Sequence, residues 1–385
     1  MRIFSIEIGR AQRYAALLLL LFAVQFFWVL ARQPLTERDY QYARCGRELW
    51  EKPSPLSGYF TSCGNLQDGT LAYRVAGLPL TLERMVAGEP VAASTWESRH
   101  VLRSVRLLLH LPFLLFGLWL GGALWWVARR IYGNHGGMIA LTLYCFSPTM
   151  LQACLQPNNE ILAAWGLFGL VYTAIGVAHT MQSPPRRWPP RIALLTLALG
   201  LTACAHIAAA FLGLLLAFGF MLYLAEHRRP MVMQVLLLAC IGAFFLLFAS
   251  YTFNADAFSY MLQGAAARIW FSLAEAKLYF VSLPNAGATI AVATAVAFYA
   301  LHRRIRYFGN TAPFLTAALL LTIVTTGVRS QPWLWALPFV FVFTGGVFAD
   351  LLESAQARSF RWLIVAILLA QIALCLASLP GLALA

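Results

Sequence analysis

The chain has 385 residues, of which 61% are hydrophobic and only 11% are charged. A soluble domain of this length cannot bury so much apolar surface in one core, so the composition excludes an ordinary water-soluble protein. The net charge of +13 is also found in nucleic-acid-binding proteins, but here the basic residues lie in short segments between apolar runs. Membrane lipids are therefore expected as partners, and nucleic acid is not.

Apolar runs long enough to cross a bilayer follow one another along the chain. We expect about eleven spanning helices, at Tyr14–Leu30, Val105–Val127, Gly137–Leu155, Glu160–Met181, Ile192–Ala205, Ile207–Leu224, Met231–Tyr251, Pro284–Leu301, Asn310–Val328, Pro332–Leu352 and Trp362–Leu384. This predicts an all-α polytopic membrane protein. The whole chain, 1–385, is expected to form one transmembrane domain without a separate soluble domain.

Arginines mark every second segment between the apolar runs. They lie at Arg2, Arg10 and Arg13, at Arg129 and Arg130, at Arg186, Arg187 and Arg191, at Arg228 and Arg229, at Arg303, Arg304 and Arg306, and at Arg358 and Arg361. By the positive-inside rule, this side faces the cytoplasm. The N-terminus is then cytoplasmic, and an odd number of spans places Ala385 outside.

The two longest polar segments, 31–103 and 253–283, both fall on the external side and form the first and second external loops. In the first loop, Thr36 is a good N-cap residue and Thr36–Trp50 predicts an amphipathic helix. A second such helix is expected over Thr70–Ala87, because its leucines recur at three- and four-residue spacing. Both suit the boundary between lipid and water. The cytoplasmic loops are short, so any chemistry is expected at the external face.

Five of the seven cysteines lie in or beside apolar runs, where cysteine behaves as a small buried hydrophobe. Cys45 and Cys63 instead lie together in the first external loop. An oxidising compartment permits a disulfide between them, and the alternative is two reduced cysteines.

Two of the fifteen acidic residues stand at the external ends of spans, where an ionisable group is costly and often functional. Asp39 follows the first span, and Glu160 opens the fourth. The alternative for each is an acid in the first turn of a helix, favoured by the helix dipole.

Basic residues on the external side could bind a phosphate if they surround one polar cavity. They are Arg44, Arg74, Arg103, Arg106, Arg268, Lys277 and Arg329. The alternative for those at span ends is snorkelling to the interface. His206, at the turn between two spans, is either a ligand or a polar turn residue.

Several short motifs resemble the type-C glycosyltransferases, in the bacterial protein O-mannosyltransferase-like and aminoarabinose transferase-like superfamily. They are Asp39-Tyr40, Ala76–Leu80 (AGLPL), Ala128–Gly133 (ARRIYG), Phe146-Ser147-Pro148, Gln156–Glu160 (QPNNE), Gly200–Thr202 (GLT) with His206, and Arg329 with Trp335–Phe339 (WALPF).

The resemblance implies a membrane glycosyltransferase that moves a sugar from a polyprenyl-phosphate-linked donor to a lipid, glycan or protein acceptor. The transfer would take place at the external face of the bacterial inner membrane. It implies Asp39 as the catalytic base and Glu160 as the second acid. If a divalent cation such as Mg²⁺ or Mn²⁺ is needed, these two acids would hold it. The positions expected to bind the donor phosphate are Arg103, Arg106, His206, Arg268 and Arg329.

The chain departs from the family pattern at Glu160, which follows two asparagines where the usual second acid is Asp, and at His206, which replaces a lysine. These departures leave the acceptor and the activity open. Two alternatives therefore remain: a transporter or flippase of lipid-linked precursors, and a non-catalytic membrane subunit with the same fold. No inverted repeat with matching broken helices favours the transporter.

The charge pattern makes a direct prediction about topology. Single cysteines placed in Gln182–Arg191 or in His302–Asn310 should react only with membrane-permeant thiol reagents, and cysteines in 31–99 should also react with impermeant ones. Labelling of either arginine-rich loop from outside would overturn the threading.

Overall fold

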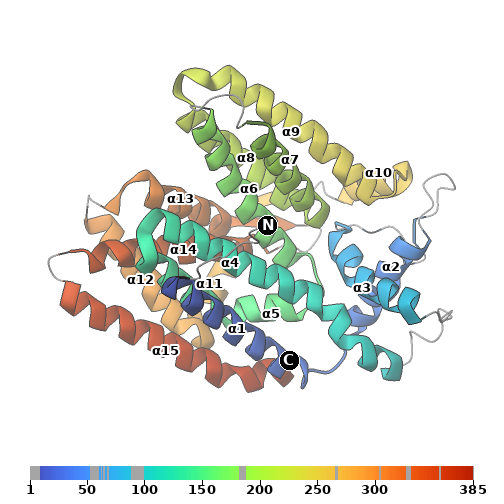
Figure 1. The fold of residues 1–385 in the computed structure, drawn as a ribbon, viewed down its shortest axis with the longest axis horizontal. Helices are drawn as coiled ribbons and strands as arrows, with labels where there is room; N and C mark the ends of the chain where they lie inside the picture. Colours follow the sequence, from blue (N-terminus) through green and yellow to red (C-terminus); the bar gives the residue numbers. More distant parts are fainter. Residues whose placement is uncertain are drawn as a thin grey trace, which may run out of the picture.

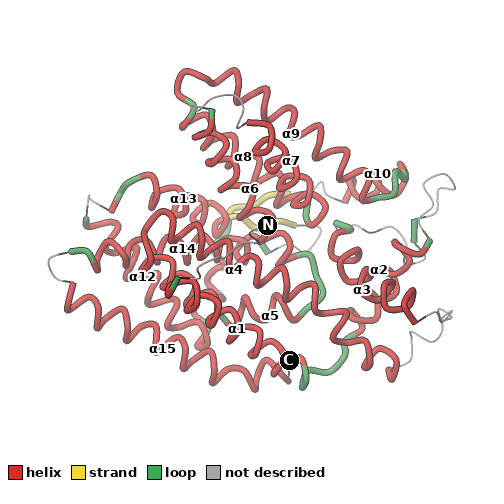
Figure 2. Tube along the Cα trace, viewed as in Figure 1, coloured by secondary structure: helices red, strands yellow, loops and turns green. Residues whose placement is uncertain are grey.

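The computed structural model describes residues 9–52, 60–61, 63, 66, 69–87, 99–181, 188–264, 268–302, 305–326, 331–354 and 357–384. Helices make up nearly all of these residues (Figure 1). The strands that they contain are β1 (Arg268–Phe271) and β2 (Ile323–Thr326), which pair antiparallel with Arg268 opposite Thr326 (Figure 2). The predicted all-α polytopic membrane fold is therefore confirmed, with one short ribbon added.

Eight helices in the described part of the chain are long and apolar enough to cross a membrane. They are α1 (Arg10–Leu30), α4 (Arg99–Cys145), α6 (Glu160–Thr180), α8 (Ile207–Leu224), α9 (Arg229–Ser250), α12 (Ala286–Leu301) with the helical turn before it from Leu283, α14 (Pro332–Leu352) and α15 (Ala357–Leu384). Two shorter apolar helices, α7 (Trp188–Ala205) and α13 (Phe308–Thr322), lie among them.

Helix α4 contains two of the predicted spans. Its 47 residues form two helical arms that meet at Gly133, where φ is 75° and ψ is −171°, outside the helical range. A positive φ favours glycine and lets the chain turn sharply here. The Tyr144 hydroxyl of the second arm donates to the Gly117 carbonyl oxygen of the first at 2.6 Å, so the two arms run antiparallel. The predicted break between the two spans is therefore present, but the first arm continues through Arg129 and Arg130 and the turn lies at Gly133. After Cys145, Ser147 caps the short helix α5 (Pro148–Leu155), which completes the second of the two spans.

The predicted span Asn310–Val328 is wrong at its end, because α13 stops at Thr322 and the chain continues as β2. The residues Ile323–Thr326 are all β-branched, which favours an extended backbone where a partner strand is present. That partner is β1, from the second external loop. The same loop also forms α10 (Ala255–Gly264) and α11 (Ala274–Val281).

Helix α14 is the centre of the bundle, with 94% of its most apolar window buried. Its Gly345 lies against α4 so closely that an added Cβ would come within 2.6 Å of the Gly136 carbonyl oxygen. Glycine thus lets these two backbones touch, as small residues do in membrane bundles. In contrast, α1, α9 and α15 bury about a third of their windows or less. Their exposed apolar side chains suit contact with lipid.

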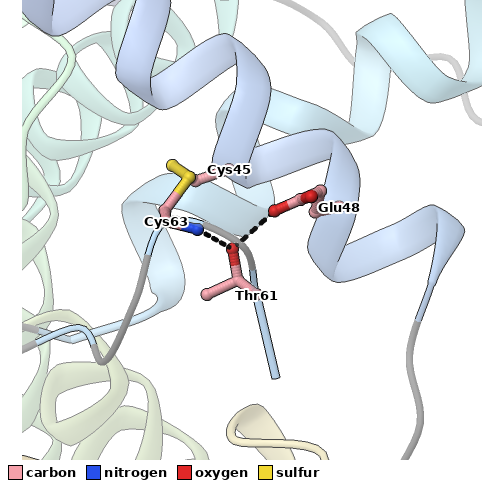
Figure 3. Close-up of a disulfide and its surroundings, with 4 residues drawn as sticks. All are labelled: Cys45, Glu48, Thr61 and Cys63. Carbon is pink, nitrogen blue, oxygen red and sulfur yellow. Dashed lines mark hydrogen bonds between the residues drawn. A yellow bond between two sulfur atoms is a disulfide. The ribbon is translucent and has the colours of Figure 1, made fainter. Parts of the chain in front are cut away.

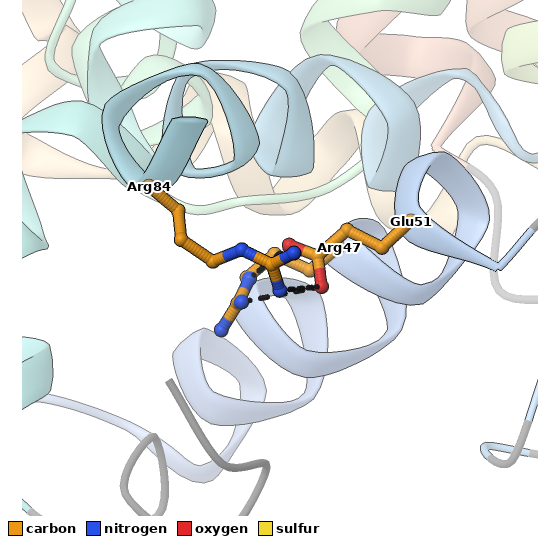
Figure 4. A network of polar contacts seen from close by, with 3 residues as sticks. All are labelled: Arg47, Glu51 and Arg84. Atoms are coloured by element: carbon orange, nitrogen blue, oxygen red, sulfur yellow. Dashed lines mark hydrogen bonds and ion pairs between the residues drawn. The ribbon is translucent and has the colours of Figure 1, made fainter. Parts of the chain in front are cut away.

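The helices of the first external loop, α2 (Glu37–Glu51) and α3 (Leu71–Ala87), match the predicted ones closely. They cross at Gly46 and Gly77, where a Cβ on Gly77 would lie 2.1 Å from the Gly46 carbonyl carbon. At the far end of this pair, Glu51 accepts from Arg47 and Arg84, each at 2.7 Å (Figure 4). Tyr42 stacks on Tyr73 at the other end, so α2 and α3 run in the same direction and form a packed helix pair at one end of the bundle (Figure 1).

Two further sets of contacts fix this helix pair. Cys45 on α2 forms a disulfide with Cys63, with the two Cα atoms 5.9 Å apart, and the Thr61 hydroxyl donates to Glu48 Oε2 at 2.7 Å (Figure 3). On α3, the Arg74 guanidinium donates twice to the Ser250 carbonyl oxygen, at 2.9 and 2.6 Å. These bonds connect the helix pair to the end of α9.

Non-reducing mass spectrometry of the proteolysed protein should recover a peptide pair joined through Cys45 and Cys63. Closing this loop is expected to stabilise the fold by about 3 kcal/mol, since it restricts the unfolded chain. Cys145, which is buried and unpaired, is the internal control and should be alkylated only after denaturation. Alkylation of Cys45 and Cys63 without prior reduction would reject the bridge.

Candidate functional site

A cavity of about 340 Å³ lies where the end of α1, the start of α2, the first turns of α4 and the link between α5 and α6 meet. Its walls are mainly polar and charged, which is unusual at the end of a bundle of apolar helices. The lining residues are Gln33, Pro34, Thr36, Glu37, Arg38, Asp39, Arg106, His110, Leu155, Gln156 and Pro157.

Asp39 is held by the first turn of α2. Its Oδ2 accepts from the Thr36 N–H at 2.7 Å, and its own N–H donates to Thr36 Oγ1 at 3.4 Å, which together form a capping box. The side chain is only 3% exposed, so Asp39 is not a solvated acid. Its Oδ1 faces α4, where His110 Nε2 lies 3.5 Å away.

Arg106 and His110 enter the cavity from one face of α4, one turn apart. The Arg106 guanidinium donates to the Gln33 carbonyl oxygen at the end of α1. His110 is 3% exposed, and its Nδ1 lies 2.8 Å from the Leu155 carbonyl oxygen. His110 is not among the site residues that the sequence predicted. The signal was present, however, because this histidine interrupts an otherwise apolar run within a span.

Glu160 and His206 meet at a different residue, Trp335 of α14. The Trp335 indole N–H donates to Glu160 Oε2 at 2.8 Å, and the Gln331 N–H donates to the same oxygen at 3.3 Å. His206 caps α8 by accepting from the Ala208 N–H, and its ring packs edge-on against Trp335 at 5.0 Å. Glu160 is only 7% exposed.

The two asparagines before Glu160 both form hydrogen bonds to backbone groups. Asn158 Oδ1 accepts from the Glu160 N–H at 3.0 Å. Asn159 is buried and reaches the first external loop, donating to the Gly69 carbonyl oxygen at 3.0 Å and accepting from the Ala72 N–H at 3.1 Å. The departure from the family pattern at these positions therefore joins the loop to the start of α6.

The other predicted site residues lie partly or wholly outside the described residues. Arg103 falls within α4 and Arg268 opens β1, but their side chains are not among those described. Arg329 lies outside the described residues altogether. The structure thus brings Asp39 and Arg106 to one cavity, and Glu160 and His206 to one tryptophan. The roles of all these residues stay predictions.

The residues present do not fit a divalent cation shared by Asp39 and Glu160. Asp39 lines the cavity, whereas Glu160 is not among the lining residues and is held beside Trp335 by two N–H donors. Within the described ranges, no group of three or more His, Cys, Asp or Glu side chains could hold a metal ion.

Solved structures that share this fold include two transferases. ArnT from Cupriavidus metallidurans in the apo state is 14% identical, with a TM-score of 0.60, covering 97% of this chain and 74% of that one. The Archaeoglobus fulgidus oligosaccharyltransferase in its apo form is 11% identical, with a TM-score of 0.59, covering 98% of this chain and 56% of that one. No protein-family model and no curated protein sequence matches the chain.

Two further structures of these transferases hold lipid phosphates. ArnT from C. metallidurans was solved bound to undecaprenyl phosphate, with 13% identity, a TM-score of 0.59 and coverage of 96% of this chain and 74% of that one. The A. fulgidus enzyme AglB was solved with an inhibitory peptide and a dolichol-phosphate, with 12% identity, a TM-score of 0.56 and coverage of 96% and 56%. The chain therefore has the type-C glycosyltransferase fold that the motifs predicted.

Trp335→Phe should test the bond to Glu160, because phenylalanine keeps an aromatic ring but has no N–H. A buried carboxylate that loses a donor destabilises the fold by about 1–3 kcal/mol. Thermal unfolding in detergent measures the change. Trp333→Phe, two positions earlier in α14, is the matched control and should unfold close to wild type. Equal Tm values for both variants would show that the bond contributes nothing to stability.

Proposed function

We propose that the chain is a membrane glycosyltransferase. It takes a sugar from a polyprenyl-phosphate-linked donor and passes it to a hydroxyl of a lipid, glycan or protein acceptor at the external face of the bacterial inner membrane. The fold supports this proposal, because it is shared with ArnT and with an oligosaccharyltransferase whose solved structures include lipid phosphates.

The observation that carries the proposal is the cavity that contains Asp39 and Arg106. A buried carboxylate and a guanidinium beside the end of a span are the two kinds of group that this reaction needs. The carboxylate can take a proton from the acceptor, and the guanidinium can bind the phosphate. The cavity adjoins the ends of α1 and α4, so a lipid donor could enter from the membrane.

The reaction follows from these roles. Asp39 removes the proton of the acceptor hydroxyl. At the same time, the hydroxyl oxygen forms a bond to the anomeric carbon of the sugar. The bond from that carbon to the phosphate oxygen breaks, and the electron pair stays on the phosphate. Arg106 stabilises the charge that develops there, since an aligned cation in a desolvated site costs little reorganisation. Glu160, held by Trp335, positions the acceptor and does not transfer a proton.

Asp39→Asn tests the base directly. The amide oxygen can still accept from the Thr36 N–H, so the capping box is kept while the proton acceptor is lost. Loss of a general base lowers the rate by about 10²–10⁴-fold. The assay is sugar transfer from polyprenyl-phosphate-linked donors in membranes that contain equal amounts of each variant. Glu160→Gln keeps an acceptor oxygen for Trp335 and should lower the rate less.

Asp256→Asn is the matched control, because Asp256 is an exposed acid in the first turn of α10. It should transfer sugar at the wild-type rate. Near-wild-type turnover by Asp39→Asn would reject Asp39 as the base and leave it as a helix cap. Absence of turnover by the wild type with every donor would favour the transporter or the non-catalytic subunit.

A further inference from the structure

The tautomer of His110 is fixed by its surroundings. Its Nδ1 lies 2.8 Å from the Leu155 carbonyl oxygen. A carbonyl oxygen can only accept a hydrogen bond, so Nδ1 must carry the hydrogen. In the neutral ring, Nε2 then has a free lone pair, and this nitrogen belongs to a side chain that lines the cavity and is 3% exposed.

The distance between the His110 and Asp39 side chains is too long for a hydrogen bond between them. Nε2 and Oδ1 are 3.5 Å apart, whereas a hydrogen bond between an imidazolium and a carboxylate is about 2.7–2.9 Å long. Nε2 is buried and has no hydrogen-bond partner among the described residues. A buried nitrogen left in this way is costly, unless something that enters the cavity supplies a donor.

We propose that His110 is the second half of the proton acceptor, and that the hydroxyl of the sugar acceptor binds in the cavity beside Nε2 and Asp39 Oδ1, within hydrogen-bond distance of both. This inference rests on the glycosyltransferase function proposed above and adds a residue to its mechanism. The hydroxyl supplies the donor that Nε2 lacks. Leu155 orients the ring from α5, as a backbone carbonyl orients a catalytic histidine elsewhere.

The proton balance is simple. As the hydroxyl oxygen bonds to the anomeric carbon, its proton passes to the pair of Nε2 and Oδ1, which approach from 3.5 Å to hydrogen-bond distance in order to share it. The product state is an imidazolium bonded to a carboxylate, which is a charge-assisted hydrogen bond. The sugar–phosphate bond breaks at the same time, and the phosphate leaves with the electron pair. The proton returns to water after the products depart.

Charged groups from two elements face the space between Nε2 and Oδ1. Asp39 faces it from α2, and Arg106 lies one turn before His110 on α4. Glu37 and Arg38 line the same cavity from α2, and α5 presents the Leu155 carbonyl to the ring. Protonation of Nε2 before the reaction would remove the acceptor, so the wild-type rate should fall on the acid side.

The test is a double-mutant cycle on the rate of sugar transfer. His110→Gln keeps a donor for the Leu155 carbonyl but cannot accept a full proton. It should lower kcat by about 10²–10⁴-fold, with little change in KM for the donor. Because the two residues act on one proton, the Asp39→Asn/His110→Gln double variant should be no slower than the slower single variant. Losses that multiply in the double variant would overturn the proposal.

Two further measurements separate catalysis from structure. His135→Gln, at an exposed position of the same helix α4, is the matched control and should keep the wild-type rate. His110→Ala should recover part of its activity when imidazole is added, because the cavity can admit it. A structural role predicts no rescue and an unchanged acid limb of the pH profile, and that outcome would also overturn the proposal.

These outcomes can be told apart from failure of the proposed function. A wild-type protein that transfers no sugar would remove the glycosyltransferase itself. A wild-type protein that transfers sugar, with His110→Gln within about threefold of it, would remove only the role of His110, since loss of a proton acceptor has a far larger effect.

Discussion

The site depends on one constraint, which is that a carboxylate is buried at the point where a helix begins. Removing Asp39 from water is unfavourable unless its oxygens are satisfied. The Thr36 N–H satisfies Oδ2, and so fixes both the start of α2 and the direction of the side chain. Oδ1 therefore faces α4, where proton transfer from the acceptor hydroxyl is proposed.

The surrounding contacts hold the helix pair of α2 and α3 against the bundle, so that the direction of the Asp39 side chain is maintained. Arg74 binds the end of α9, and Asn159 connects the start of α3 to the start of α6. The close crossing at Gly46 and Gly77 leaves little room for the two helices to shift. A rigid base and a rigid phosphate-binding group are what a transfer reaction requires, because small displacements of reacting groups lower rates strongly.

Local signals in the sequence were enough for much of this arrangement. Thr36 marked the start of α2, the long apolar runs marked the spans, and the Asp39 and Glu160 positions came from their placement at span ends. The predicted end of the ninth span failed because Ile323–Thr326 needs the partner strand β1, which is far away in the chain. The predicted break between the second and third spans is present, but it narrows to a turn at Gly133, because glycine can adopt the positive φ that ends one arm and begins the next.

The role of His110 could not be read from the chain in the same way. Its tautomer depends on a carbonyl 45 positions away, and its distance from Asp39 depends on how α2 packs against α4. The same holds for Trp335 of α14. Its indole contacts Glu160, at the start of α6, and His206, the N-cap of α8. Sequence patterns indicate which residue types are present at a membrane boundary, but the packing decides which atoms face one another.

The central claim is tested most directly with purified protein in liposomes that contain a glycosyl polyprenyl phosphate and an acceptor. Mass spectrometry of the lipids and the acceptor follows the sugar. The account predicts that free polyprenyl phosphate and glycosylated acceptor appear together with wild-type protein, and about 10²–10⁴-fold more slowly with Asp39→Asn. Movement of the intact donor across the bilayer, without cleavage of its sugar–phosphate bond, would contradict it.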